Sequence, residues 1–317
     1  CFWGLVKTLK EGKAFANTVI MCFTVIVIGF SLFTVVIIRS SAKTPTKEYQ
    51  PDNAFTLCRY LGREQYGSKP LIYGEYYGAP YTIEEQYYWA PLNGKYVKSK
   101  GQMSIKYPSE AKMFFPRMWD SSSPRYIDFY KSYVKNVKNI KGGKHPNPSM
   151  IDNLAFFFDY QMNWMYWRYF MWNFAGRQND IHSPSPGEPF LGNWESGIKP
   201  LDEFRLGNQD SAPAYLRENK GKNHYYMLPL LLGIIGIFFQ FGRDRRSSWY
   251  TFLLFFMTGI AIVLYLNQQP FQVRERDYAY AGSFYVYAIW CGLAVLALYT
   301  WITDKLKKTE GTRATVI

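Results

Sequence analysis

The most unusual local sequence is a short polar stretch between two apolar blocks near the C-terminus. Four consecutive charged residues, Arg274, Glu275, Arg276 and Asp277, are followed there by Tyr278. Guanidinium groups make forked hydrogen bonds to phosphate oxygens, and neighbouring carboxylates can orient the arginines or receive protons. The stretch is therefore a candidate phosphate-binding loop. The alternative is an ordinary solvated loop with internal ion pairs.

A second group of polar residues lies within and just after a segment rich in Trp, Tyr and Phe, Asn153–Gly176. Arg168 stands among these aromatic residues, where it can stack on their rings by cation–π contact or reach a lipid headgroup. Arg177 and Asp180 follow the segment and form a polar cluster with Gln178 and Asn179. A structural arginine and a capping network are the alternative explanations for these residues.

No other arrangement of residues indicates a reaction. The three histidines lack ligand spacing, and the chain contains no glycine-rich phosphate loop and no nucleophile elbow. The four cysteines form neither a disulfide framework nor a zinc pattern, so we predict no metal and no identifiable cofactor. The net charge of +13 is scattered along the chain without a nucleic-acid motif. We therefore expect contact with anionic membrane lipids and not with nucleic acid.

The elements that must position these residues are membrane helices, because the apolar residues are concentrated in a few long blocks. Four runs contain no charged residue and have 25, 17, 18 and 19 residues: 14–38, 225–241, 249–266 and 284–302. A helix of about 20 apolar residues crosses a hydrocarbon core of about 30 Å. The sequence thus predicts four transmembrane helices, at 14–38, 224–241, 249–266 and 284–303.

The distribution of basic residues predicts the orientation of these helices. The short segments 1–13, 242–248 and 304–317 each carry at least three lysines or arginines, and the positive-inside rule places them in the cytoplasm. Arg39, Lys43 and Lys47 count against this orientation, but long translocated domains follow the rule weakly. Residues 39–223 and 267–283 then lie outside. The predicted fold class is a membrane α-helical, multi-span bundle with a large extracytoplasmic domain that is aromatic-rich and mainly helical or mixed.

Within the outer domain, the segment near 153–176 is predicted to be a helix that lies in the membrane interface or packs on the bundle. As a fifth span it would carry Asp159 and Arg168 into lipid, which is costly. We also predict a short helix over Asp52–Gly67, capped by Asp52, and a strand at Leu71–Gly74. Two long loops are predicted, at Ser121–Pro148 and Asp180–Asn208.

Several phrases of the sequence resemble a known family, and the similarity runs over nearly the whole chain. The phrases are Val36–Ala42, Tyr60–Gly67, Met165–Asp180, His224–Leu230 and Arg274–Tyr280. Together they resemble a bacterial family of large membrane proteins, long catalogued as of unknown function. That family is related to the eukaryotic transmembrane protein O-mannosyltransferase that acts on plexin-type receptors.

The resemblance implies a glycosyltransferase of the GT-C type in the bacterial cytoplasmic (inner) membrane, with its large domain facing the periplasm. Such enzymes move a sugar from a lipid-phosphate donor to an acceptor, here a protein or a glycan, on the outer face. They usually place an essential acidic residue in the first outer loop. Because the match covers the later part of such a protein, we expect the catalytic residue outside these 317 residues.

The resemblance also suggests roles for residues of this chain. By analogy, Arg274 and Arg276 would hold the lipid phosphate, with Arg168 in support. The expected supporting polar residues are Glu275, Asp277, Tyr278, Arg177 and Asp180. The main alternative is a non-catalytic membrane scaffold that docks a partner through its aromatic outer domain. A transporter fits less well, because the spans carry no intramembrane charge and show no inverted repeat.

Overall fold

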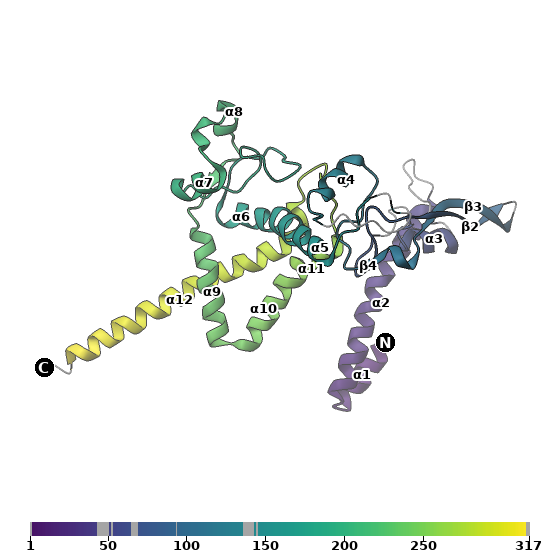
Figure 1. The fold of residues 1–317 in the computed structure, drawn as a ribbon. Helices are drawn as coiled ribbons and strands as arrows, with labels where there is room; N and C mark the ends of the chain where they lie inside the picture. The colour runs from purple at the N-terminus through teal and green to yellow at the C-terminus, as the bar shows by residue number, and fades with distance from the viewer. Residues whose placement is uncertain are drawn as a thin grey trace. The chain divides into compact units, whose positions relative to one another are not determined.

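The computed structural model describes residues 2–42, 51, 53–64, 69–92, 94–135, 143 and 145–314. The chain divides into two compact units. The first comprises Cys1–Ser68 and Ile83–Ile105, and the second comprises Lys69–Thr82 and Lys106–Ile317. The elements of each unit are labelled in Figure 1 and are described separately below.

The first unit contains a helical hairpin. Helix α1 (Phe2–Lys10) turns at Gly12, which has a positive φ of 66°, and folds back onto helix α2 (Ala14–Ser41). The Asn17 side chain donates a hydrogen bond of 2.8 Å to the Leu5 carbonyl and joins the two helices. Helix α2 has 28 residues, and its most apolar 18-residue stretch is left uncovered by protein, as expected for a helix in lipid.

The first unit also contains a short helix and a long β-hairpin. Helix α3 (Ala54–Leu61) begins after Asn53, whose side chain accepts hydrogen bonds from two backbone N–H groups of the first turn. The predicted cap, Asp52, and the end of the predicted helix at Gly67 lie outside the described residues. Strands β2 (Thr82–Leu92) and β3 (Lys95–Lys106) pair with each other, a hairpin that the sequence analysis did not predict.

The second unit is built on apolar helices. They are α9 (Leu228–Arg243), α10 (Arg245–Thr258), α11 (Ile260–Leu266) and α12 (Ala281–Ala314), the last preceded by the 3-10 turn η5 (Asp277–Tyr280). Asp244 separates α9 from α10, and its side chain caps α10 by accepting from two backbone N–H groups. Figure 1 shows α12 running beside both α9 and α10.

Helices α9 and α12 approach closely because α9 presents two buried glycines. A methyl group at Gly233 would meet the ring of Tyr287, and one at Gly236 would meet the backbone carbonyl of Trp290. Two hydrogen bonds of 2.7 Å also cross between the helices, from Tyr287 to the Leu230 carbonyl and from Trp290 to Gln240. Small residues at such crossings let helix backbones pack at short range.

Within the described residues, three helical segments are long and apolar enough to cross a membrane: Ala14–Ser41, Arg245–Leu266 and Asp277–Leu306. The part of the chain that the structure describes is therefore mainly helical, with three candidate membrane spans. The second predicted span differs from expectation. Helix α9 has only 16 residues, about 24 Å at 1.5 Å per residue, because Tyr226 and Met227 have positive φ angles and delay its start to Leu228.

The aromatic segment forms a continuous helical stretch in the core of the second unit. It consists of α5 (Met150–Phe156), the π-helix η3 (Phe157–Trp167) and α6 (Arg168–Phe174). Most of its side chains are buried, and it packs against α9, α11 and η5. A π-helix winds more loosely than an α-helix and is often found at functional sites. The predicted interfacial position of this stretch stays a prediction.

Smaller elements complete the second unit. Strand β1 (Tyr73–Glu75) pairs antiparallel with β4 (Lys112–Phe114), and β5 (Gly176–Arg177) pairs antiparallel with β6 (Asn223–His224). The remaining elements are η2 (Ser109–Ala111), α4 (Pro124–Lys131), α7 (Lys199–Leu206), η4 (Gln209–Ser211) and α8 (Ala214–Arg217). Both predicted long loops therefore contain a helix, α4 and α7, in each of which a proline occupies the first turn.

The close contact of α9 and α12 leads to a first prediction. Gly236→Ala would push the added methyl into the Trp290 carbonyl, so we expect a stability loss of roughly 1–3 kcal/mol. Thermal unfolding in detergent measures the effect. Gly242→Ala, in the same helix, meets no atom within 4 Å and is expected to leave the transition unchanged or raise it slightly. Equal behaviour of the two variants would contradict the packing described here.

Candidate functional site

The candidate site is centred on the loop 267–276, which connects α11 to η5 and so lies between two candidate membrane spans. Asn267, the first residue of the loop, has a left-handed backbone conformation with φ of 38° and is fully buried. The Asn267 side chain donates to the carbonyls of Pro70 (2.6 Å) and Pro116 (2.9 Å). It also accepts a hydrogen bond of 3.0 Å from Gln161. The loop therefore leaves α11 in a defined direction.

The other end of the loop is held by an ion pair between Glu275 and Arg168, at the start of α6. The two Arg168 Nη atoms lie 2.6 Å and 3.3 Å from the two carboxylate oxygens, a bidentate arrangement. The Arg168 side chain is 3% exposed and that of Glu275 is 14% exposed. Arg168 also donates to the carbonyls of Trp164 and Gly192, so four of its five N–H groups have acceptors within this protein.

Two further groups complete the environment of the Glu275 carboxylate. Tyr169 donates to it at 2.6 Å, and the backbone N–H of Ser183 donates at 3.1 Å. Burial opposes its ionisation, but the hydrogen bonds and charge of Arg168, with those of Tyr169 and Ser183, outweigh it and lower the pKa of Glu275. Burial raises the pKa of Tyr169 well above its ordinary range, so this phenol remains a donor.

Aromatic rings also surround the Arg168 guanidinium. Its central carbon lies 4.0 Å from the ring centre of Trp164 and 4.8 Å from that of Trp172. The guanidinium carbon of Arg177 lies 4.1 Å from the same Trp172 ring. The aromatic segment thus stabilises two cations by cation–π contact. A cation buried among rings still needs a counter-ion, which Glu275 supplies.

His182 joins the loop to the chain that follows α6. Its Nε2 atom lies 2.9 Å from the Gln272 carbonyl oxygen, and its Nδ1 atom lies 3.2 Å from a carboxylate oxygen of Glu275. The second contact is not an aligned hydrogen bond, because Nδ1 is buried without a hydrogen-bond partner. No pattern in the sequence pointed to His182, since its partners are about 90 residues away.

The predicted phosphate-binding residues lie on either side of the anchored Glu275. Arg274 is exposed, and its guanidinium carbon lies 5.6 Å from the ring centre of Tyr278, which is also exposed. Arg276 is half-buried, and its Nε atom is buried without a hydrogen-bond partner. Asp277 begins η5 and is half-buried. The loop therefore places Glu275 inward and leaves the charge of Arg274 directed to its surface.

Lys69 brings a further positive charge to this loop. Its ammonium donates a hydrogen bond of 3.4 Å to the Leu266 carbonyl at the end of α11. Desolvation and the nearby charge of Arg276 lower the pKa of Lys69, whereas Asp120 acts in the opposite direction. Two like charges held together in this way favour the binding of an anion. The sequence analysis did not predict a role for Lys69.

The last two predicted residues bond within the segment that follows α6. Arg177 Nε donates to the Asn179 carbonyl at 2.9 Å, in addition to its contact with Trp172. Asp180 is exposed and accepts a hydrogen bond of 2.8 Å from Asn219. These contacts stabilise the chain that carries His182 and Ser183. Arg177 and Asp180 are thus placed to support the loop indirectly.

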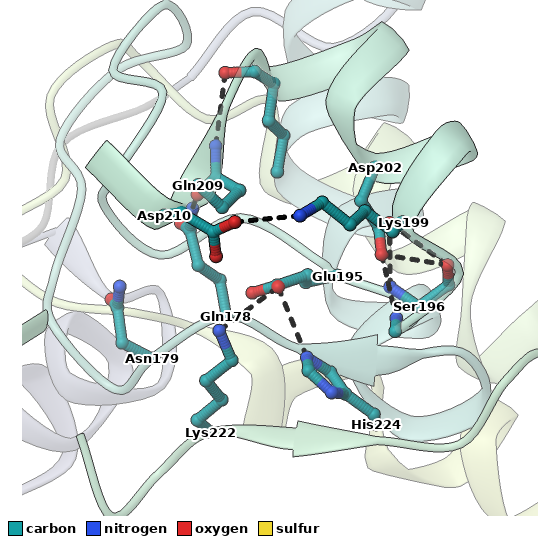
Figure 2. Close-up of polar contacts among 12 residues, drawn as sticks. Gln178, Asn179, Glu195, Ser196, Lys199, Asp202, Gln209, Asp210, Lys222 and His224 are labelled. Atoms are coloured by element: carbon teal, nitrogen blue, oxygen red, sulfur yellow. Dashed lines mark hydrogen bonds and ion pairs between the residues drawn. The ribbon is translucent and has the colours of Figure 1, made fainter. Parts of the chain in front are cut away.

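A second polar cluster lies around Glu195, whose side chain is 7% exposed. Lys222 Nζ at 3.1 Å and His224 Nε2 at 3.2 Å both approach the same oxygen of its carboxylate, as Figure 2 shows. The neighbouring Asp202 accepts hydrogen bonds from Ser196 and from the Gly197 backbone and so holds this segment against α7. Within the described residues, no group of three His, Cys, Asp or Glu side chains could hold a metal ion.

Comparison with known proteins gives one finding. Residues 67–158 match the model of a family of unknown function (DUF8416). This match spans 92 residues, from 67 to 158, and includes β1 to β4, α4 and α5 but not the loop 267–276. No curated protein and no solved structure matches the chain.

The buried ion pair leads to a prediction about pH and stability. Because the pKa of Glu275 in the folded protein lies below its ordinary value of 4.5, the stabilisation is complete above that pH. It is lost as the pH falls through the lowered pKa. We therefore expect the wild-type protein to lose thermal stability as the pH falls below 4.5, with a smaller loss in Glu275→Gln. Thermal unfolding at stepped pH measures both.

The same variant is expected to be less stable at neutral pH by roughly 3–5 kcal/mol, because Arg168 keeps its buried charge without a counter-ion. Glu203→Gln, which alters an exposed ion pair with Lys199, is the matched control and should change stability by about 1 kcal/mol or less. The interpretation fails if the two variants are equally stable.

Proposed function

We propose that this chain is part of a GT-C-type membrane glycosyltransferase that moves a sugar from a lipid-phosphate donor to an acceptor on the extracytoplasmic face. The observation that carries the proposal is a cationic loop, anchored by a buried ion pair, between two candidate membrane spans. A phosphate attached to a lipid lies at the membrane surface, where such a loop would also lie. Arginine side chains suit this ligand because their fork matches phosphate oxygens.

The arrangement of the family-like phrases supports the same proposal. Three of them, Met165–Asp180, His224–Leu230 and Arg274–Tyr280, are far apart in the sequence but touch in the structure. The first contacts the third through Arg168 and Glu275. The first contacts the second through the β5–β6 pair and a 3.0 Å hydrogen bond from Tyr225 to the Ala175 carbonyl. Residues that resemble a glycosyltransferase family thus form one local assembly.

The proposed roles follow from the geometry. Arg274 and Arg276, with Lys69 beside them, would stabilise the charge on the phosphate as the bond from the sugar to the phosphate oxygen breaks. Arg168 acts through Glu275, because its guanidinium is buried and paired. Arg177, Asp180, Asp277 and Tyr278 remain supporting residues in this proposal. The carboxylate that activates the acceptor hydroxyl is proposed to lie outside these 317 residues.

The location of positive charge supports the proposed orientation in a bacterial inner membrane. Arg243, Arg245 and Arg246 lie at the turn between α9 and α10. The loop 267–276 follows the opposite end of the same α10–α11 segment. The positive-inside rule therefore favours a cytoplasmic turn and a periplasmic loop, in a multi-span bundle of the GT-C kind. The other proposed partners are membrane lipids and an acceptor protein or glycan.

The experiment is a transfer assay on membranes that contain the full-length protein, supplied with a radiolabelled sugar on a lipid-phosphate donor. The double variant Arg274→Gln/Arg276→Gln is expected to lower transfer by roughly 100-fold, the size seen when charge-stabilising groups are removed. The matched control is Arg243→Gln/Arg246→Gln, which removes two arginines from the opposite end of the helices and is expected to transfer normally.

Each outcome bears on one part of the proposal. Transfer that persists in the Arg274→Gln/Arg276→Gln protein would remove the loop from donor binding. Equal losses in both double variants would indicate a general effect on membrane insertion. If the wild-type protein transfers no sugar from any lipid-phosphate donor, the non-catalytic scaffold becomes the better explanation.

A further inference from the structure

The β-hairpin formed by β2 and β3 leaves one of its faces open. Successive side chains of a strand point to opposite faces, so Ile83, Tyr87 and Trp89 of β2 share one face. They are 59%, 52% and 49% exposed. Helix α3, which lies beside the hairpin in Figure 1, contacts Tyr88 on the opposite face and Tyr96 near the turn. A two-stranded hairpin is at best marginally stable in water, so this open face calls for a partner.

Two lysines of β3 lie on the same open face. The Lys98 ammonium is 5.2 Å from the ring centre of Tyr87. Lys100 forms an ion pair with Glu85, whose carboxylate also accepts a hydrogen bond of 2.9 Å from Tyr87. Because Glu85 compensates Lys100, the positive charge left over among these residues is that of Lys98. The hairpin as a whole contains four lysines and two glutamates, a net charge of +2.

The combination of aromatic rings and lysines on this face distinguishes a lipid surface from a protein partner. Tyrosine and tryptophan are enriched at the headgroup level of a bilayer, because each ring has an apolar body and a polar edge. Lysines close to the bilayer are attracted to anionic headgroups. Protein–protein interfaces also favour aromatic residues but are depleted in lysine. The open face therefore matches an anionic bilayer better than it matches a second protein.

A bilayer is also within reach of the hairpin. Helix α2, a candidate membrane span, ends at Ser41, and α3 begins at Ala54. The chain between these two residues can extend over at most about 45 Å. Helix α3 in turn contacts the hairpin, where the Arg59 guanidinium carbon lies 4.4 Å from the ring centre of Tyr88. The length of the chain thus allows the hairpin to lie on the bilayer that holds α2.

We propose that the open face of the β2–β3 hairpin lies on the surface of this bilayer and binds anionic phospholipid headgroups. Tyr87, Trp89 and Ile83 enter the headgroup region, and the Lys98 ammonium meets a lipid phosphate. The lipid contact supplies the stabilisation that the hairpin lacks in water. This surface is separate from the loop 267–276, and the inference does not depend on sugar transfer.

The test identifies the molecule that contacts the hairpin by photo-crosslinking. The full-length variant Tyr87→p-benzoylphenylalanine is reconstituted in phosphatidylcholine vesicles with and without phosphatidylglycerol and then illuminated. Mass spectrometry of the adduct shows whether the partner is a phospholipid or a protein. We expect phospholipid adducts, roughly fivefold more abundant with phosphatidylglycerol, the effect of one lysine charge at an anionic surface.

Three further variants serve as controls. The same photoreactive residue at Tyr88, on the opposite face, is expected to give few lipid adducts. At Ile26, which is 54% exposed in the middle of α2, it should give lipid adducts in both kinds of vesicle. In the Tyr87 variant, Lys98→Gln should remove the preference for phosphatidylglycerol. Lys220→Gln changes an exposed lysine outside the hairpin and should keep that preference.

Several outcomes would overturn the proposal. One is the absence of lipid adducts at position 87 when position 26 gives them. Another is an adduct to a second copy of this chain, which would make the open face a protein interface. Equal yields with and without phosphatidylglycerol would exclude recognition of anionic headgroups. Because no sugar donor is present, failure of the transfer assay leaves this test unaffected.

Discussion

The ion pair between Arg168 and Glu275 is the interaction on which the arrangement of the loop 267–276 depends. The Arg168 side chain is 3% exposed among aromatic rings, and its buried charge requires a counter-ion. This counter-ion is Glu275, 107 residues further along the chain. Because the pair is bidentate, it fixes the direction as well as the position of Glu275. Removing either partner would leave a buried charge. The pair therefore determines where the loop lies more than it adds to net stability.

The packing of the apolar helices α9 and α12 positions the segments that carry both partners. Gly233 and Gly236 let α12 approach α9, and the chain immediately before each helix carries one side of the assembly. β6 precedes α9 and pairs with β5, which follows α6, while η5 and Glu275 precede α12. Close helix packing thus brings the segments of the site together, although none of the contacting residues are neighbours in the sequence.

The sequence predicted features that depend on composition and missed those that depend on distant partners. Uncharged runs located the apolar helices, and the charged stretch 274–277 was identified as a loop between two of them. Helix α9 was predicted too long because the positive φ angles of Tyr226 and Met227 have no signature in hydropathy. The partnership of Arg168 with Glu275, the position of His182 and the Glu195 cluster require contacts over tens of residues that periodicity does not encode.

The balance of charge explains why this loop is proposed to bind an anionic ligand although it contains Glu275 and is followed by Asp277. Glu275 is paired with Arg168, which lies on another element, so its negative charge does not compensate the charges of Arg274 and Arg276. Lys69 approaches the same region and is repelled by Arg276, with Asp120 only partly compensating. Because the Glu275 carboxylate points inward, the charge at the surface of the loop is positive. An inward glutamate that orders the loop and an outward Arg274, which we propose to meet the ligand, are two consequences of one buried ion pair.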